Sequence, residues 1–195
     1  MLLDRLKKYT IVLASQSPRR KELLEGMGLQ FVVEKPVTDE KNPSKFSSIQ
    51  LVEYLSIEKA KAVSPLYNLE NTIVIGGDTI VCIDDIVMGK PKDKGEAKNM
   101  LKQLSGKKHT VISGLCLIHK HKIVYNHDIS HVYFKELSSE EIDYYIEKHQ
   151  PFDKAGAYGI QEWIGYVGIS KIEGSYYNVM GLPTHLLWKM LADGL

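Results

Sequence analysis

One apolar run constrains the fold of this chain more than any other feature. Residues 72–75 read "TIVI" and continue through two glycines to Asp78, without a charged position on either face. A strand that alternates polar and apolar residues leaves one face in water, but this pattern is typical of a strand buried on both faces. Other apolar segments must therefore cover it on two sides, which favours an α/β arrangement.

Segments with helical spacing alternate with β-type runs along the chain. The β-type runs cover 10–14, 30–37, two runs about an "IDDI" turn within 71–93, and two or three strands within 109–137. Helical patterns cover 18–28, 49–63, 93–106, 138–151 and 184–195, whereas 153–183 shows little helical pattern. The alternation predicts an α/β fold with flanking helices, and the hairpins predict a mixed, twisted sheet. No linker or repeat interrupts it, so residues 1–195 are expected to form a single domain.

The charge balance of the whole chain argues against binding to nucleic acid or to a membrane as its function. The 25 lysines and arginines nearly balance the 24 acidic residues, for a formal net charge of +1. There is no whole-protein electrostatic case for a nucleic-acid or membrane partner, so any cationic site has to be local. Cys82 and Cys116 lie inside apolar runs, as free thiols do in a reducing compartment. With no apolar stretch of spanning length, we expect a soluble cytoplasmic protein.

The first candidate site follows the strand predicted at 10–14. The segment "ASQSPRR" places Ser17 at a helix N-cap position, Pro18 at the first helical position, and Arg19 and Arg20 directly afterwards. Backbone N–H groups at a helix start attract anions, and Ser15 with the two arginines adds donors for a phosphate. The alternative is a solvated helix start, although two cations there are mildly unfavourable.

Asp78 is the second candidate, because a carboxylate that ends an apolar run is costly unless it is paired, protonated or bound to a metal. It is therefore a candidate metal ligand or general base, and the alternative is an ordinary aspartate at a strand end or turn. Gly76 and Gly77 permit close approach of a ligand or a bulge. Asp39 and Glu40, in a polar loop, are candidate oxygen ligands for Mg²⁺ beside substrate phosphates.

Two lysines extend the candidate anion site. Lys59 lies in an apolar helical stripe, so its stem is expected to point inward, with the ammonium group either facing an anion or reaching solvent. Lys90 follows the return strand of the hairpin as either a phosphate ligand or a solvated lysine. If residues 84–85 form a tight turn, Thr79 falls opposite Lys90, and Asp78 faces away unless a bulge intervenes.

The segment "DKAGAYGIQ" at 153–161 is a weaker candidate, in which Lys154 and Gln161 stand among small and aromatic residues. The amide of Gln161 has the donor and acceptor needed to read the edge of a nucleobase, and Tyr158 can pack or stack. A purely structural loop is the alternative.

Taken in order, these segments resemble the Maf family of nucleotide pyrophosphatases. The resemblance rests on "LASQSPRRKELL", "TDE", "LSIEKAKA", "GGDTIV", "GKPKD", "LSGKKHTVISG", "DKAGAYGIQ" and "IEGSYYNVMGLP", and it spans 11–183. It implies cleavage of a nucleoside triphosphate between the α and β phosphates, giving the monophosphate and pyrophosphate, with a divalent cation such as Mg²⁺ or Mn²⁺. It also implies an α/β fold with two lobes around a deep central cleft, as in the inosine triphosphate pyrophosphatases, and a homodimer.

The resemblance also implies roles for particular residues. Asp78 matches the catalytic proton acceptor, and the metal would be held by Asp78 and Glu40. The residues expected to bind substrate are Ser15, Arg19, Arg20, Lys59, Thr79, Lys90, Lys154 and Gln161. Among these, Arg19, Thr79 and Gln161 match the branch that acts on dTTP and UTP rather than the branch that acts on 7-methyl-GTP.

The chain departs from the family pattern at three places. Gly77 replaces an alanine, His149 and Gln150 stand where a glutamate is common before proline, and Glu162 replaces a glycine after Gln161. Glu162 would add a charge near the expected base pocket and so bears on base preference.

Two rival functions stay open: a pyrophosphatase for inosine, 7-methyl-GTP or modified bases, and a non-catalytic nucleotide-binding regulator of cell division.

Overall fold

The computed structural model describes residues 1–38 and 46–194 and contains a seven-stranded mixed sheet. The strands lie in the order β2-β1-β3-β5-β6-β7, with β4 paired to β3. β1 pairs in parallel with β2 and β3, whereas β3–β4 and β6–β7 are antiparallel. The strands are β1 (Thr10–Ala14), β2 (Val32–Glu34), β3 (Thr72–Ile83), β4 (Ile86–Met88), β5 (Lys108–His119), β6 (Lys122–Phe134) and β7 (Ile169–Glu173). The predicted α/β class and mixed sheet are confirmed.

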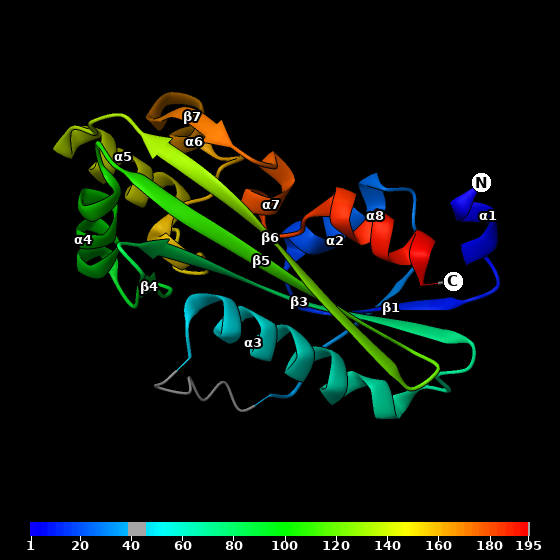
Figure 1. Cartoon of the computed structure of the whole chain (residues 1–195). Helices are drawn as coiled ribbons and strands as arrows, with labels where there is room; N and C mark the ends of the chain where they lie inside the picture. Colours follow the sequence, from blue (N-terminus) through cyan, green and yellow to red (C-terminus); the bar gives the residue numbers. More distant parts are fainter. Residues whose placement is uncertain (39–45, 195) are drawn as a thin grey trace. The chain divides into compact units, whose positions relative to one another are not determined.

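The helices confirm most of the predicted helical segments (Figure 1). They are α1 (Leu2–Leu6), α2 (Pro18–Gly26), α3 (Ser48–Val63), α4 (Lys94–Leu104), α5 (Ser139–His149), α6 (Trp163–Gly168), α7 (Tyr176–Met180) and α8 (Thr184–Asp193), with 3₁₀ turns at Ser64–Leu66 and Ala155–Ala157. Ser17 occupies the N-cap position of α2 without a side-chain capping hydrogen bond, and Pro18 follows at the first helical position. Ser138 forms a capping box with Glu141 at the start of α5. Within the described ranges, no helix is both long and apolar enough to cross a membrane.

Sequence reasoning missed α6, β7 and α7, which all lie in the segment where little pattern was found. Each has only five or six residues, so the apolar period that marks a longer helix or strand does not develop. The short helix α1 was missed for the same reason.

The chain divides into two compact units. Unit 1 comprises Met1–Asp78, Ser113–Asp128 and Gly181–Leu195, and unit 2 comprises Thr79–Ile112 and Ile129–Met180. The boundary within β3 falls directly after Asp78, so β3 contributes to both units, as do β5 and β6. The cleft between lobes and the single domain both stay predictions.

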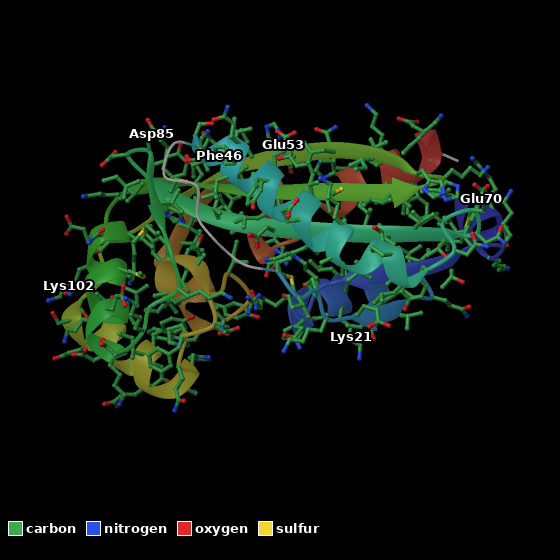
Figure 2. All side chains as sticks on the ribbon, turned by 90° about the horizontal axis from the view of Figure 1, so that it is seen from below. Lys21, Phe46, Glu53, Glu70, Asp85 and Lys102 are labelled. Atoms are coloured by element: carbon green, nitrogen blue, oxygen red, sulfur yellow. The ribbon has the colours of Figure 1, made fainter. Side chains whose placement is uncertain are left out.

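Unit 1 packs α3 against strands β1 and β3, and α8 lies on the other side of these strands (Figure 1). Ile73, Val74 and Ile75 are fully buried, as the uninterrupted apolar run predicted. A cluster of buried side chains joins helix and strands: Val12, Ala14, Ala60, Val63, Val74, Cys116 and Ile118. Polar side chains such as those of Lys21 and Glu70 lie on the outside of this unit (Figure 2).

Two glycines let α3 approach the sheet unusually closely. A Cβ on Gly76 of β3 would lie 2.8 Å from the backbone nitrogen of Ala60 and would also collide with the carbonyl oxygen of Ser56. A Cβ on Gly114 of β5 would lie 2.6 Å from Ser56 Oγ. Real Cβ atoms cannot occupy such positions, so both strands need glycine where the helix crosses them.

Unit 2 includes the hairpin of β3 and β4, whose turn residues Asp84 and Asp85 have φ of 48° and 63°. These values are typical of a two-residue type I′ turn and confirm the tight turn predicted at "IDDI".

Elsewhere in this unit His109, 2% exposed, packs against Phe134 and Tyr158, and its Nε2 lies 2.7 Å from the Tyr158 hydroxyl.

The close approach of α3 gives a stability prediction. Gly76→Ala should lower the free energy of unfolding by about 1–3 kcal/mol, because the added methyl group meets backbone atoms that cannot move independently. Gly26→Ala, at the end of α2, is the control, because its Cβ meets nothing within 4 Å. It should be neutral or gain up to about 1 kcal/mol of stability. Urea unfolding measures both, and equal stability of the two variants would contradict the packing argument.

The buried imidazole predicts a pH dependence. Burial lowers the pKa of His109 from its ordinary value of 6.5 to about 4. Between these values the unfolded chain binds a proton that the folded chain does not, so stability falls as the pH drops from 6.5 to 4. The contribution is on the order of 2–3 kcal/mol.

Unfolding titrations of His109→Gln over this pH range should show a shallower loss of stability than the unmodified chain. His121→Asn, in an exposed turn where residue 121 has φ of 60°, should keep the original slope. An unchanged slope in the His109 variant would refute the assignment.

Candidate active site

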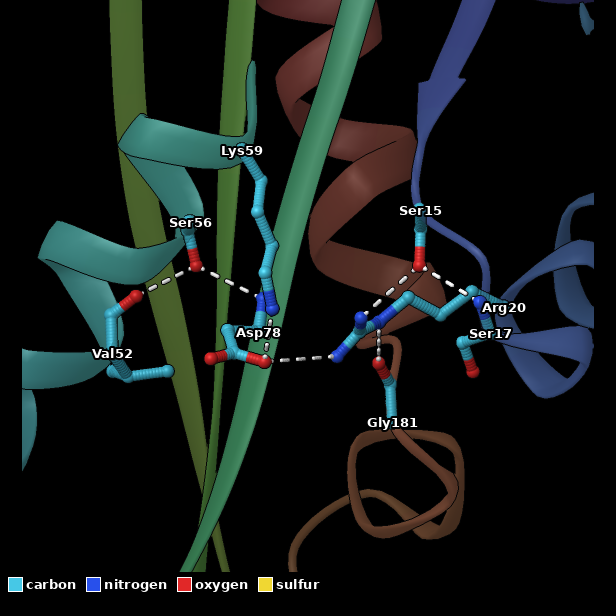
Figure 3. A network of polar contacts seen from close by, with 8 residues as sticks. All are labelled: Ser15, Ser17, Arg20, Val52, Ser56, Lys59, Asp78 and Gly181. Atoms are coloured by element: carbon cyan, nitrogen blue, oxygen red, sulfur yellow. Dashed lines mark hydrogen bonds and ion pairs between the residues drawn. The ribbon is translucent and has the colours of Figure 1, made fainter. Parts of the chain in front are cut away.

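The turn from β1 into α2 is organised by Ser15, directly after the strand. Its hydroxyl oxygen accepts hydrogen bonds from the backbone nitrogen of Ser17 at 3.1 Å and from Arg20 Nη1 at 3.3 Å (Figure 3). Ser15 is buried, so these bonds form away from bulk water. The predicted polar corner is therefore a preformed turn that holds Arg20 in place.

Arg20 is buried although it stands in the first turn of α2. The next residue, Lys21, is directed outward (Figure 2). Arg20 is 8% exposed, and its Nε donates to the carbonyl oxygen of Gly181 at 2.9 Å. Its Nη2 lies 3.8 Å from Asp78 Oδ1 (Figure 3). Burial lowers the pKa of Arg20, Asp78 opposes this shift, and Arg19 adds to it. A guanidinium still stays protonated at neutral pH.

Asp78 meets a second cation from α3. Lys59 Nζ lies 3.1 Å from the same Oδ1 atom, so Arg20 and Lys59 share one carboxylate oxygen (Figure 3). The other carboxylate oxygen lies on the side away from Arg20 (Figure 3). Lys59 thus points inward toward Asp78, which pairs the carboxylate that sequence reasoning considered costly.

Ser56 of α3 holds the backbone of Asp78 beside the Lys59–Asp78 ion pair. Its hydroxyl donates to the carbonyl oxygen of Val52 at 2.7 Å and accepts from the backbone nitrogen of Asp78 at 3.0 Å. Sequence reasoning missed Ser56, which is fully buried within the apolar face of α3. A serine three residues before the candidate lysine, on one helix face, is the signal that could have revealed it.

The summed charge of the cluster is positive, because two cations meet one carboxylate. Low local dielectric strengthens the interaction of such a group with an anion. Donors on Ser15, Arg20 and Lys59 come from three segments of unit 1. The arrangement suits a phosphate chain, and Asp78 is the group that can accept a proton there.

Other predicted residues lie elsewhere. Arg19 is half-buried on α2, and Glu40 with Asp39 lies outside the described residues. The hairpin register pairs Val81 with Met88, which would set Thr79 opposite Lys90 if the pairing continued. However, β4 ends at Met88, and Lys90 is exposed beyond it.

Unit 2 holds the predicted residues of the "DKAGAYGIQ" segment. Lys154 is buried, and its Nζ lies 2.7 Å from Asp153 Oδ1 and 3.0 Å from Glu162 Oε1. Gln161 is half-buried, and its Oε1 atom is buried without a hydrogen-bond partner in the part of the chain that the structure describes. The charge of Glu162 is therefore paired with Lys154, which it shares with Asp153.

Comparison with known proteins now identifies the group to which the chain belongs. The model of the Maf family, described as Maf-like protein, matches residues 10–194. The chain belongs to the Maf family. This confirms the resemblance found in the ordered motifs, and the Maf match covers both compact units.

Relatives within the family are similar over nearly the whole chain. A protein named dTTP/UTP pyrophosphatase from Porphyromonas gingivalis is 49% identical over 195 residues, which cover 98% of each chain. Proteins of the same name from Phocaeicola vulgatus, 47% identical over 97% of this chain and 98% of the relative, and Christiangramia forsetii, 44% identical over 100% and 99%, are also similar.

The donor set fits a divalent cation only if substrate completes it. No group of three or more His, Cys, Asp or Glu side chains suited to a metal is found among residues 1–38 and 46–194. Magnesium is commonly bound by one or two carboxylates together with substrate phosphates and water. The Asp78 oxygen on the side away from Arg20 matches that mode as a single protein ligand (Figure 3).

An inorganic polyphosphate tests the anion site without turnover or metal. With chelator present, tripolyphosphate should raise the melting temperature of the protein, because it binds only the folded state. Arg20→Gln should weaken apparent affinity by about 10–100-fold, as expected for loss of a charge-assisted hydrogen-bond donor. Lys21→Gln is the matched control on the same helix and should behave as the unmodified chain.

Each shift is measured from the variant's own ligand-free melting temperature, so that a change in intrinsic stability does not enter. If tripolyphosphate raised the melting temperature of Arg20→Gln as much as that of the unmodified chain, the anion would bind at a site that does not include Arg20.

Proposed function

We propose that this chain is a nucleoside triphosphate pyrophosphatase that hydrolyses dTTP and UTP to the monophosphate and pyrophosphate. The observation that carries the proposal is the partly buried cluster in which Asp78 is shared by Arg20 and Lys59. Relatives named dTTP/UTP pyrophosphatase over almost the full length support the substrate class.

In this proposal the phosphate chain is held by cations and hydroxyl groups of unit 1. Arg20 and Lys59, together with Arg19 and Ser15, neutralise the charge that develops on the phosphoryl oxygens as the anhydride bond breaks. Contacts to Gly181, Ser17 and Asp78 set the positions of Arg20, Ser15 and Lys59, respectively, before substrate arrives. Such preorganisation lowers the cost of orienting donors in the transition state.

Asp78 accepts a proton from the water that attacks the phosphate. Its backbone is held by Ser56, and one of its carboxylate oxygens is held by Lys59. A carboxylate that is fixed in this way keeps a constant direction toward the substrate.

The divalent cation belongs to the proposal. Mg²⁺ or Mn²⁺ would be held by Asp78, by Glu40 and by substrate phosphates, and a bound cation polarises phosphoryl oxygens and neutralises their charge.

Thr79, Lys90 and Gln161 are proposed to contact substrate, on the family resemblance. A homodimer and a cytoplasmic location are proposed as well, and two buried cysteines outside any disulfide fit a reducing compartment.

A nucleotide panel tests the activity. Pyrophosphate release should be fastest from dTTP and UTP when compared with CTP, ITP and 7-methyl-GTP, and a chelator should abolish it. Pyrophosphate release mainly from another nucleotide would support the proposed reaction but contradict the assignment of dTTP and UTP as substrates. No release from any nucleotide by folded protein would favour a binding protein without turnover.

Substitution of Asp78 tests its proposed role as the proton acceptor. Asp78→Asn should lower pyrophosphate release by about 10²–10⁴-fold, because the amide cannot accept the proton. Asp85→Asn is the control, since residue 85 lies in an exposed turn with φ of 63° that asparagine tolerates (Figure 2). Full activity of folded Asp78→Asn would refute the proton-acceptor role.

A further inference from the structure

A second, partly buried polar network lies in unit 2, around Glu162, one of the residues that depart from the family pattern. Glu162 uses both carboxylate oxygens: Oε1 lies 3.0 Å from Lys154 Nζ, and Oε2 accepts a hydrogen bond from the Tyr145 hydroxyl. The same hydroxyl accepts from the backbone nitrogen of Gly159 at 3.0 Å. Tyr145 is fully buried on α5, so the network is anchored in the core of unit 2.

This network closes the segment that carries Gln161. Lys154 stands at its beginning and Glu162 at its end, and their ion pair joins the two. A Cβ on Gly159 would lie 2.9 Å from the Glu162 carboxyl carbon and 3.1 Å from Lys154 Cε, so the backbone packs directly on this pair. Tyr158 is held separately by the bond to His109. The backbone that leads to Gln161 is thus restrained on both sides.

Charge balance distinguishes this network from the cluster in unit 1. Lys154 meets two carboxylates, those of Asp153 and Glu162, so the sum of the three charges is negative. Such a lysine is poorly suited to bind a phosphate, because its charge is already neutralised. Its contacts instead favour a structural role, for which the buried ion pair and hydroxyl are well placed.

Gln161 directly precedes Glu162 and has an amide oxygen that is buried without a partner among the described residues. A buried acceptor without a donor is costly, so a ligand donor that reaches it is recognised strongly. Uracil and thymine carry an N–H group at ring position 3, whereas cytosine has an unprotonated nitrogen there. An amide oxygen held in a fixed position therefore distinguishes these bases.

We propose that Glu162 is a positioning residue for nucleobase selection: through Lys154 and Tyr145 it fixes the segment whose Gln161 oxygen accepts the ring N–H of uracil or thymine. The inference rests on the proposed function for the identity of the base. Glu162 itself does not touch substrate. Its loss frees the segment and relaxes selection, while the phosphate chemistry at Asp78 continues.

Steady-state kinetics with UTP, dTTP and CTP test this. Glu162→Ala should raise KM for UTP and dTTP by about tenfold, the size expected for loss of a base-specific hydrogen-bond contact, with kcat little changed. The preference for UTP over CTP should fall by a similar factor. Glu162→Gln keeps an oxygen for Lys154 and a polar group for Tyr145, so it should recover most of the preference.

Glu147→Ala is the matched control, an exposed glutamate on α5 two residues after Tyr145, and it should leave KM and selectivity unchanged. Tyr145→Phe removes the hydroxyl link between Gly159 and Glu162 without removing charge. It should relax selection in the same direction, and it carries the test if Glu162→Ala does not fold.

Equilibrium binding of UMP and CMP separates this inference from the proposed function. Unchanged KM and UTP preference in folded Glu162→Ala would overturn the inference and leave the pyrophosphatase intact. A loss of kcat alone, equal for all nucleotides, would also overturn it. If the unmodified chain releases no pyrophosphate, the proposed function fails. A UMP preference that Glu162→Ala loses would then still support the inference, and no such preference would overturn it.

Discussion

Asp78 Oδ1 receives Lys59 at 3.1 Å and Arg20 at 3.8 Å, and the polar interior of unit 1 depends on this shared carboxylate oxygen. Without the carboxylate, two cations would lie side by side with little water to screen them, and an uncompensated buried charge costs several kcal/mol. With it, the cations are held but not fully neutralised. The same balance that stabilises the two cations leaves the cluster with a net positive charge, which suits the proposed phosphate chain.

Close packing brings these charges together. Lys59 and Ser56 belong to α3, and that helix reaches Asp78 only because Gly76 and Gly114 carry no side chain where it crosses the strands. Ser56 then bonds the backbone of Asp78 directly. The two glycines are therefore points of close contact between helix and strands, and the rigidity of the site comes from the packing they permit.

Unit 2 uses the same kinds of group for a different purpose. Lys154 meets two carboxylates, so its charge is consumed within the network, while Tyr145 connects Glu162 to the backbone of Gly159. Excess cation in one cluster suits a polyanion, and excess carboxylate in the other suits internal restraint. On the proposed functions, the ratio of charges rather than the presence of lysine separates the phosphate-binding cluster of unit 1 from the positioning network of unit 2.

Local signals in the sequence determined the strand at 72–75, the turn at 84–85, the capped helices and, through ordered motifs, the family. They missed α6, β7 and α7, which are too short to show a period. The sequence also named Arg20, Lys59 and Asp78 as separate candidates. Only the tertiary structure decided that they share one oxygen, that Ser56 supports them and that Glu162 neutralises Lys154. Capping and periodicity act between near neighbours, whereas ion pairs depend on distances that chain folding alone sets.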